Sequence, residues 1–174
     1  MTIPVWKKGL GLQKINQVRI SHDGRWARKH LESLKVAYSK APYFDDHLKF
    51  VEEMFSSRFE KLIDLNMAVI RYLLEQLEIR TEVVLLSELG IEARGGILPV
   101  EICRKMGAVG FLAQDSAGKY LDRPLFDEAG IRLESFKIPS PVYPQLWGSF
   151  IPNLSAFDLV FNCGPRARDI LMRK

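Results

Sequence analysis

The stretch from about residue 80 to 138 alternates two patterns, and this alternation constrains the fold more than any other feature. Short apolar or alternating runs, typical of strands, are separated by helical stripes that stop at Gly107 and Gly130. The predicted elements are a strand at 81–86, a helix from near Pro99 to 106, a strand at 109–113, a helix at 124–129 and a strand at 131–138. This order predicts a mostly parallel sheet with right-handed crossovers and helices on both faces.

Helical patterns dominate the rest of the chain. Apolar residues recur at spacings of three and four before residue 80, and a helical pair closes the sequence at about 153–174. These helices are predicted at 26–38, 45–55, 62–77, 155–162 and 165–173. The segments 2–6 and 17–20 are predicted to form a small hairpin. We therefore expect one α/β domain, 1–174, around a β-α-β core at about 80–138.

The composition excludes several classes of protein. With 174 residues, of which 47% are hydrophobic, the chain can bury the core of an ordinary globular domain. Its apolar runs are far shorter than the roughly 20 residues that cross a bilayer, and its start lacks the order of a signal peptide, so we expect a cytoplasmic protein. The 2 cysteines and 3 histidines have no ligand spacing, so we expect no metal site.

Positive charge is concentrated in the first 40 residues. This segment contains nine Lys or Arg residues and two acidic residues, Asp23 and Glu32. Such a basic N-terminal module, about 1–40, can attract a phosphate-bearing small molecule or a nucleic acid, or it can be a solvated face. Because zinc-finger spacing and RNA-binding patterns are absent from the sequence, we expect no specific nucleic-acid partner.

A polar loop after the predicted strand 109–113 offers one candidate site. Lys119 follows Gly118, and in an anion-binding turn its ammonium would hold a phosphate or carboxylate beside backbone amides and Tyr120. The alternative is a β-turn with an exposed lysine and a half-buried tyrosine, since the loop lacks a full nucleotide-binding motif.

A second candidate site lies at the start of the predicted helix 155–162. Asn153 and Ser155 suit substrate binding, although helix capping explains both residue types. Asp158 sits at the edge of the buried stripe, where a carboxylate is either paired or used as an acid-base group. We expect Asp158 to face the same crevice as Lys119.

Two further residues complete the candidate set. Gln145 precedes Trp147, and an amide beside an aromatic ring suits sugars or nucleobases, whereas core packing is the plainer role of the tryptophan. His30 on the first helix is predicted to be half-buried, either as a general base or as a packing histidine. The predicted catalytic residues are thus Asp158 and His30, and no cofactor is singled out.

The segment from Tyr143 to Gly164 resembles the C-terminal signature of the WbqC-like protein family. The resemblance is collinear over nearly the whole chain. It includes Thr2–Val5, Trp26 with Lys29–Leu31 and Tyr38, Ala41–Phe44, Ile102–Ala108 and Gly118–Leu121. It implies a cytoplasmic role in O-antigen or capsule synthesis, as a transferase that moves a glycine or other acyl group to a sugar or nucleotide-sugar.

One departure from the family pattern concerns the start of the chain. The resemblance implies a further strand and helix, with Gln-Pro and Pro-Trp-Leu-Gly motifs, before the residues seen here. We therefore expect an N-terminally incomplete domain whose open sheet edge is covered by a partner chain or a second copy. The alternatives to the transferase are a nucleotide-dependent ligase or nucleotidylyltransferase-like enzyme, and an inactive truncated or partner subunit.

Overall fold

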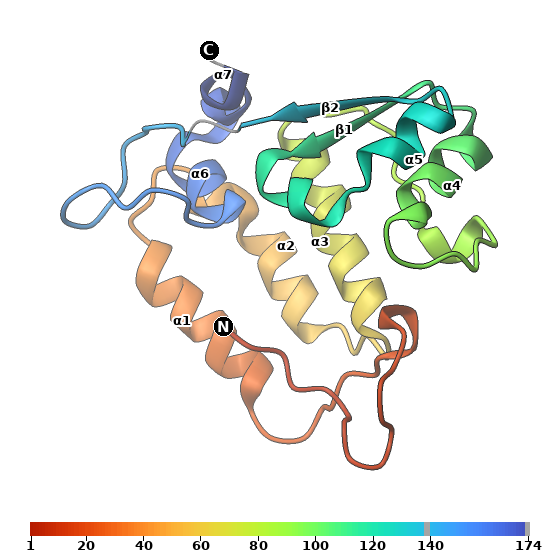
Figure 1. Cartoon of the computed structure of the whole chain (residues 1–174). Helices are drawn as coiled ribbons and strands as arrows, with labels where there is room; N and C mark the ends of the chain where they lie inside the picture. The colour runs from red at the N-terminus through yellow and green to blue at the C-terminus, as the bar shows by residue number, and fades with distance from the viewer. Residues whose placement is uncertain (138–139, 173–174) are drawn as a thin grey trace. The chain divides into compact units, whose positions relative to one another are not determined.

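The computed structural model describes residues 1–137 and 140–172, and the chain forms two compact units (Figure 1). The first unit combines Met1–Arg80 with Ser140–Lys174, and the second comprises Thr81–Pro139. Both units contain helices, and among the described residues the sheet is a parallel pair of strands. The predicted α/β class with a parallel sheet is confirmed.

Helices α1, α2 and α3 lie side by side in the first unit (Figure 1). The helices of this unit are α1 (Trp26–Tyr38), α2 (Phe44–Ser56), α3 (Leu62–Gln76), α6 (Ala156–Cys163) and α7 (Ala167–Met172), with 3-10 turns η1 (Ile15–Gln17) and η4 (Gly164–Arg166). The amphipathic stripes produce this arrangement: α2 buries Phe44, His47 and Val51, which are spaced by three and four residues. The five helices predicted from these stripes are confirmed, except that position 173 lies outside the described residues.

Phe161 of α6 lies at the centre of the first unit's core. Its ring is 5.1 Å from the rings of Tyr38 and Phe44, measured between centroids, and it is fully buried. The chain leaves α6 at Gly164, where φ is +50° and a Cβ would collide with the ring of Tyr43. Only glycine satisfies both conditions, so the approach of Tyr43 to the end of α6 depends on this residue.

The predicted N-terminal hairpin is reduced to isolated antiparallel bridges. Val5 pairs with Ile20, and Arg19 pairs in turn with Lys61, which precedes α3. The backbone of Ile20 also donates to the carbonyl of Glu60 at 2.9 Å. Residues 18–21 are therefore held between the chain's first residues and the turn that joins α2 to α3.

The second unit is a β-α-β arrangement. Its elements are the 3-10 turn η2 (Leu86–Glu88), α4 (Ile97–Met106), β1 (Gly110–Gln114), the 3-10 turn η3 (Asp115–Tyr120), α5 (Arg123–Glu128) and β2 (Arg132–Phe136). The two strands pair in parallel, in register from Gly110 with Arg132 to Gln114 with Phe136. Val100, Cys103 and Phe126 form a small core with Ile131. The predicted helix-strand-helix-strand order is confirmed, although position 138 lies outside the described residues.

The predicted strand at 81–86 is wrong. This segment has no regular structure before it enters η2, and Val83 and Leu86 are 39% and 44% exposed. A β-branched run becomes a strand only when a neighbouring strand accepts its backbone hydrogen bonds, and 81–86 pairs with neither described strand. The β propensity of residues 81–86 is therefore not sufficient to make them a strand.

Candidate functional site

The first unit contains a cavity of about 390 Å³ between the start of α1 and the end of α2. Its lining includes His22, Arg25, Trp26, Arg28, Glu52, Phe55, Ser56, Ser57 and Arg58. We call it the arginine cavity. Its volume falls within the range of about 300 to 1,000 Å³ that is usual for small-molecule sites.

Positive charge dominates the arginine cavity. Arg25, Arg28 and Arg58 come from two sequence regions, and within residues 1–137 and 140–172 none of them forms an ion pair. The cavity's carboxylate, Glu52, lies 2.8 Å from the ammonium of Lys35, which offsets its charge and raises the pKa of that lysine. The three guanidinium groups are therefore available to an anion.

Two aromatic side chains, Trp26 and Phe55, line the cavity. The ring of Trp26 lies 6.4 Å from that of Phe55 and 5.8 Å from that of His30, in edge-to-face geometry. The indole nitrogen of Trp26 donates to the carbonyl of Ser21 at 2.9 Å, which fixes the ring. The cavity thus pairs a held aromatic side chain with cations, an arrangement suited to a ligand with a ring and a phosphate.

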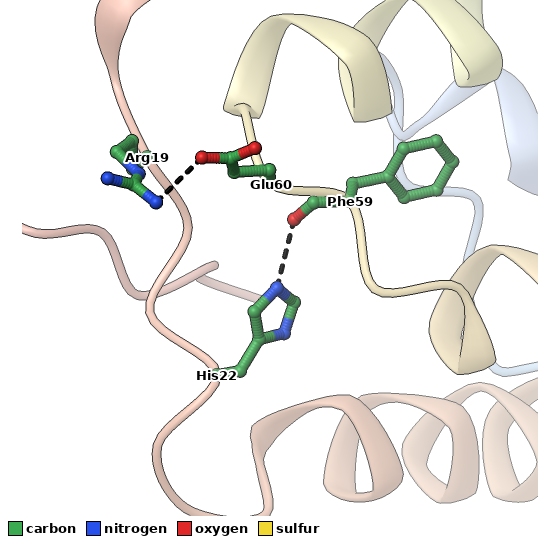
Figure 2. Close-up of polar contacts among 4 residues, drawn as sticks. All are labelled: Arg19, His22, Phe59 and Glu60. Atoms are coloured by element: carbon green, nitrogen blue, oxygen red, sulfur yellow. Dashed lines mark hydrogen bonds and ion pairs between the residues drawn. The ribbon is translucent and has the colours of Figure 1, made fainter.

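His22 contributes a nitrogen that can accept a proton. Its Nε2 lies 2.9 Å from the carbonyl oxygen of Phe59, as Figure 2 shows. Because a carbonyl oxygen only accepts, Nε2 carries the hydrogen, and in the neutral ring Nδ1 is the acceptor. The adjacent ion pair between Arg19 and Glu60, at 2.6 Å, is exposed on both sides and adds little stability.

Asp158 is the centre of a second polar cluster in the first unit. Its carboxylate is only 4% exposed and accepts hydrogen bonds from Tyr38 at 2.9 Å and Tyr143 at 2.8 Å. The amides of Gln145 and Asn162 also donate to it, at 3.0 and 3.4 Å. Four neutral donors therefore compensate a buried charge. We call these five residues the Asp158 cluster.

The tyrosines of the Asp158 cluster are held protonated. Burial, followed by the hydrogen bond to Asp158, raises the pKa of Tyr143 to about 12. The same two causes raise the pKa of Tyr38 well above its usual value. Both phenols therefore act as donors at neutral pH.

The Asp158 cluster also fixes the loop 145–151. Gln145 donates to the carbonyl of Ile151 at 3.0 Å and accepts from the amide of Ile151 at 2.9 Å. Within this loop, Trp147 donates from its indole nitrogen to the carbonyl of Ala37 and is 64% exposed. The tryptophan is therefore a surface residue with its polar edge tied down, rather than part of the core.

Comparisons with known proteins identify a family and a relative of this chain. The profile of the WbqC-like protein family matches residues 1–170. The chain belongs to that family. It is also similar to the uncharacterized protein Rv1507c of Mycobacterium tuberculosis, with 32% identity over 176 residues that cover 98% of this chain and 74% of that protein. No solved structure matches it.

This WbqC-like chain brings some predicted site residues together and separates others. Asp158 and Gln145 are hydrogen-bonded, as described above. His30 is half-buried as predicted, and its Nε2 contacts the carbonyl of Thr2 at 2.9 Å. Its position on α1 is about 12 Å along the helix axis from that of Tyr38, which contacts Asp158. Lys119 belongs to the second unit, so a crevice shared with Asp158 stays a prediction.

The remaining predicted residues have local roles in the WbqC-like structure. Ser155 caps α6 by accepting from the amide of Phe157 at 3.2 Å. Asn153 adopts a positive φ of 58°, and its side-chain oxygen accepts from Ser140 at 2.8 Å. Their substrate-binding roles stay predictions.

In the second unit, the ammonium of Lys119 lies 4.8 Å from the ring centre of Tyr120. Tyr120 is 72% exposed rather than half-buried. Anion binding by this pair stays a prediction.

The sequence pattern missed the arginine cavity and the most buried histidine. The basic module predicted positive charge around Arg25 and Arg28, but Arg58 comes from a different part of the chain. His47, not His30, is the fully buried histidine, 4% exposed, with its Nδ1 at 2.6 Å from the Tyr72 hydroxyl. Its position in the stripe of Phe44 and Val51 was the available signal.

Two general properties bear on function. None of the helices in the described ranges is long and apolar enough to cross a membrane. Across those same ranges, no three His, Cys, Asp or Glu side chains are grouped to hold a metal ion. Cys103 and Cys163 are buried in the cores of the second and first units.

Proposed function

We propose that this chain binds a sugar nucleotide or a similar phosphate-bearing small molecule in the arginine cavity and serves the transfer of an acyl group to the sugar. The observation that carries this proposal is the set of Arg25, Arg28 and Arg58 around a cavity of about 390 Å³, without carboxylate partners among the described residues. Planar guanidinium groups match phosphate oxygens in paired hydrogen bonds.

The other side chains of the cavity supply the remaining parts of such a reaction. Trp26 offers an aromatic surface to the base or the sugar, while Ser56 and Ser57 offer hydroxyl groups for hydrogen bonds. A sugar amine or hydroxyl that attacks an activated acyl group forms an amide or ester bond and must lose a proton. The bond between the acyl carbon and its activating group breaks, and the activating group leaves with the electron pair of that bond. His22 Nδ1 accepts that proton, and the Phe59 carbonyl keeps the ring oriented.

Membership of the WbqC-like family supports the choice of a transferase over other uses of an anion site. The resemblance implies a place in the synthesis of O-antigen or capsular polysaccharide, where sugars are carried as nucleotide derivatives. The contribution of the cavity is to give the phosphate groups a specific place.

The test is calorimetric titration of the full chain with UDP, UMP, uridine and ATP. UDP should bind more tightly than UMP, and uridine should bind weakest, because each phosphate adds contacts with the arginines. Arg28→Gln should weaken UDP binding about 10-fold or more, whereas Lys29→Gln, the same change of charge on a residue outside the lining, should not.

Equal affinity for UDP and uridine, or equal effects of Arg28→Gln and Lys29→Gln, would show that the cavity is not a phosphate site. Tight binding of ATP accompanied by its turnover would favour the ligase or nucleotidylyltransferase alternative. A second check is catalytic: if UDP-sugar binds, His22→Gln should leave affinity unchanged and abolish acyl transfer.

A further inference from the structure

The second unit has its own small cavity, at the carboxyl ends of its two parallel strands. It measures about 200 Å³ and is lined by side chains from β1, β2 and the segment between them. The side chains that matter here are Ala113, Gln114, Asp115, Arg123, Leu133 and Ser135. In α/β proteins this end of a parallel sheet is where ligands bind, because the chain turns away there and leaves a crevice.

The lining of this strand-end cavity combines opposite charges with apolar walls. Arg123 and Asp115 both border it, yet across residues 81–137 they form no ion pair with each other. Ala113 and Leu133 provide the apolar surface between the polar groups. A ligand that carries one negative and one positive group would satisfy both charges at once.

Size narrows the ligand further. A cavity of about 200 Å³ is smaller than the roughly 300 to 1,000 Å³ of sites for drug-sized molecules. It leaves room for a molecule of a few heavy atoms rather than for a nucleotide. We propose that the strand-end cavity binds an α-amino acid with a short side chain.

In this arrangement Arg123 holds the carboxylate and Asp115 holds the ammonium group of the amino acid. Gln114 and Ser135 supply neutral hydrogen-bonding groups, and Ala113 and Leu133 face the short side chain. Lys119, the residue that the sequence pattern favoured for an anion, does not line the cavity, and its ammonium lies over the ring of Tyr120. The proposal concerns the second unit alone and does not rest on the arginine cavity.

The experiment is a titration of the full chain with L-alanine, in which ligand-observed NMR or calorimetry measures binding. Two matched compounds accompany it: L-alanine methyl ester lacks the carboxylate charge, and N-acetyl-L-alanine lacks the ammonium. Only L-alanine should bind measurably. L-tryptophan should not compete, because its side chain is too large for the cavity.

Variants then assign the two charges. Arg123→Gln should weaken L-alanine binding about 10-fold or more and remove the discrimination against the methyl ester. Asp115→Asn should likewise weaken L-alanine binding about 10-fold or more, and it should remove the discrimination against N-acetyl-L-alanine. Both residues are exposed, so both variants should fold normally. Lys119→Gln, with the same loss of charge as Arg123→Gln in a neighbouring position, should bind L-alanine like the parent.

Three results would overturn the proposal. The first is the absence of saturable binding by L-alanine, glycine and L-valine. The second is equal binding of L-alanine and its methyl ester, and the third is equal losses in Lys119→Gln and Arg123→Gln, which would place the anion at Lys119. Arg28→Gln separates this result from the nucleotide proposal, because it should alter UDP binding and leave L-alanine binding unchanged.

Discussion

The arginine cavity and the Asp158 cluster handle charge in opposite ways. In the cavity, three guanidinium groups surround open space and have no carboxylate partner in the described part of the chain. In the cluster, one buried carboxylate, 4% exposed, accepts hydrogen bonds from four neutral donors. Unpaired exposed charge is cheap to keep and useful for a ligand, whereas buried charge must be satisfied within the protein.

Both arrangements involve α1, which Figure 1 labels in the first unit. Residues at the start of this helix line the cavity, whereas Tyr38 at its end belongs to the Asp158 cluster. One helix therefore serves both arrangements. The comparison predicts that changes in the cluster act on folding and that changes in the cavity act on binding.

The largest expected effect comes from Asp158. Asp158→Ala removes the acceptor for two phenols and two amides in a buried setting, so the free energy of unfolding should fall by roughly 3 kcal/mol or more. Urea denaturation measures this loss. Asp158→Asn should also lose stability, because its amide presents hydrogens to some of these donors.

Gln145→Leu is the matched control for Asp158→Ala, since it removes one donor and keeps the carboxylate. Its loss of stability should be smaller, and increased hydrogen exchange should be confined to the loop 145–151. If Asp158→Asn instead melts like the parent and loses only turnover, Asp158 is a catalytic group, as the sequence pattern allowed, and the contrast between cluster and cavity fails.

An intermediate effect is expected from pH, through His47. Burial lowers the pKa of His47 below its usual value, so the folded protein holds this ring neutral while the unfolded chain protonates it near pH 6.5. The stability that depends on the neutral ring is therefore fully present above about pH 6.5 and is lost as the pH falls through the lowered folded-state pKa. Urea denaturation at pH 7.5 and pH 5 should show the decrease.

His47→Gln should flatten this pH dependence, whereas His22→Gln should leave it intact, because His22 is exposed. The difference arises from the surroundings of the two rings. His47 lies in the core beside Tyr72 and Phe161, and His22 contacts one backbone carbonyl at the surface. Equal slopes in the parent and His47→Gln would show that another group controls acid stability.

The smallest effect on stability is expected in the arginine cavity. The triple variant Arg25→Gln, Arg28→Gln, Arg58→Gln should change the free energy of unfolding by less than about 1 kcal/mol, because it breaks no ion pair among the described residues. A slight gain is expected, since three like charges no longer repel one another. Thermal melting measures the change in stability, and its comparison at low and high salt measures the part due to charge repulsion. A large loss of stability would mean that these arginines are structural.

The sequence predicted helices better than strands and cavities for a physical reason. The stripes of α1, α2 and α3 are local patterns, and their helices form where the pattern places them. The segment 81–86 needed a partner strand that local pattern does not reveal. Pairing between distant segments decides such cases.

The same distinction between local pattern and distant contacts applies to the candidate sites. The position of Asp158 at the edge of a buried stripe was readable from spacing, and the structure buries it there. Its four donors come from α1, from α6 and from the segment before α6, so they were not readable from neighbouring residues. Likewise, Arg58 joins Arg25 and Arg28 only because α2 folds back along α1.

The bridge between Arg19 and Lys61 also has a consequence for the order of folding. Between these residues lie the whole of α1 and α2, so their pairing closes a long loop and must overcome its entropy. We expect the two helices to pair first and the bridge to form later. Since the contact between His22 and Phe59 lies beside this bridge, the proton-accepting side of the cavity would be assembled last and opened first.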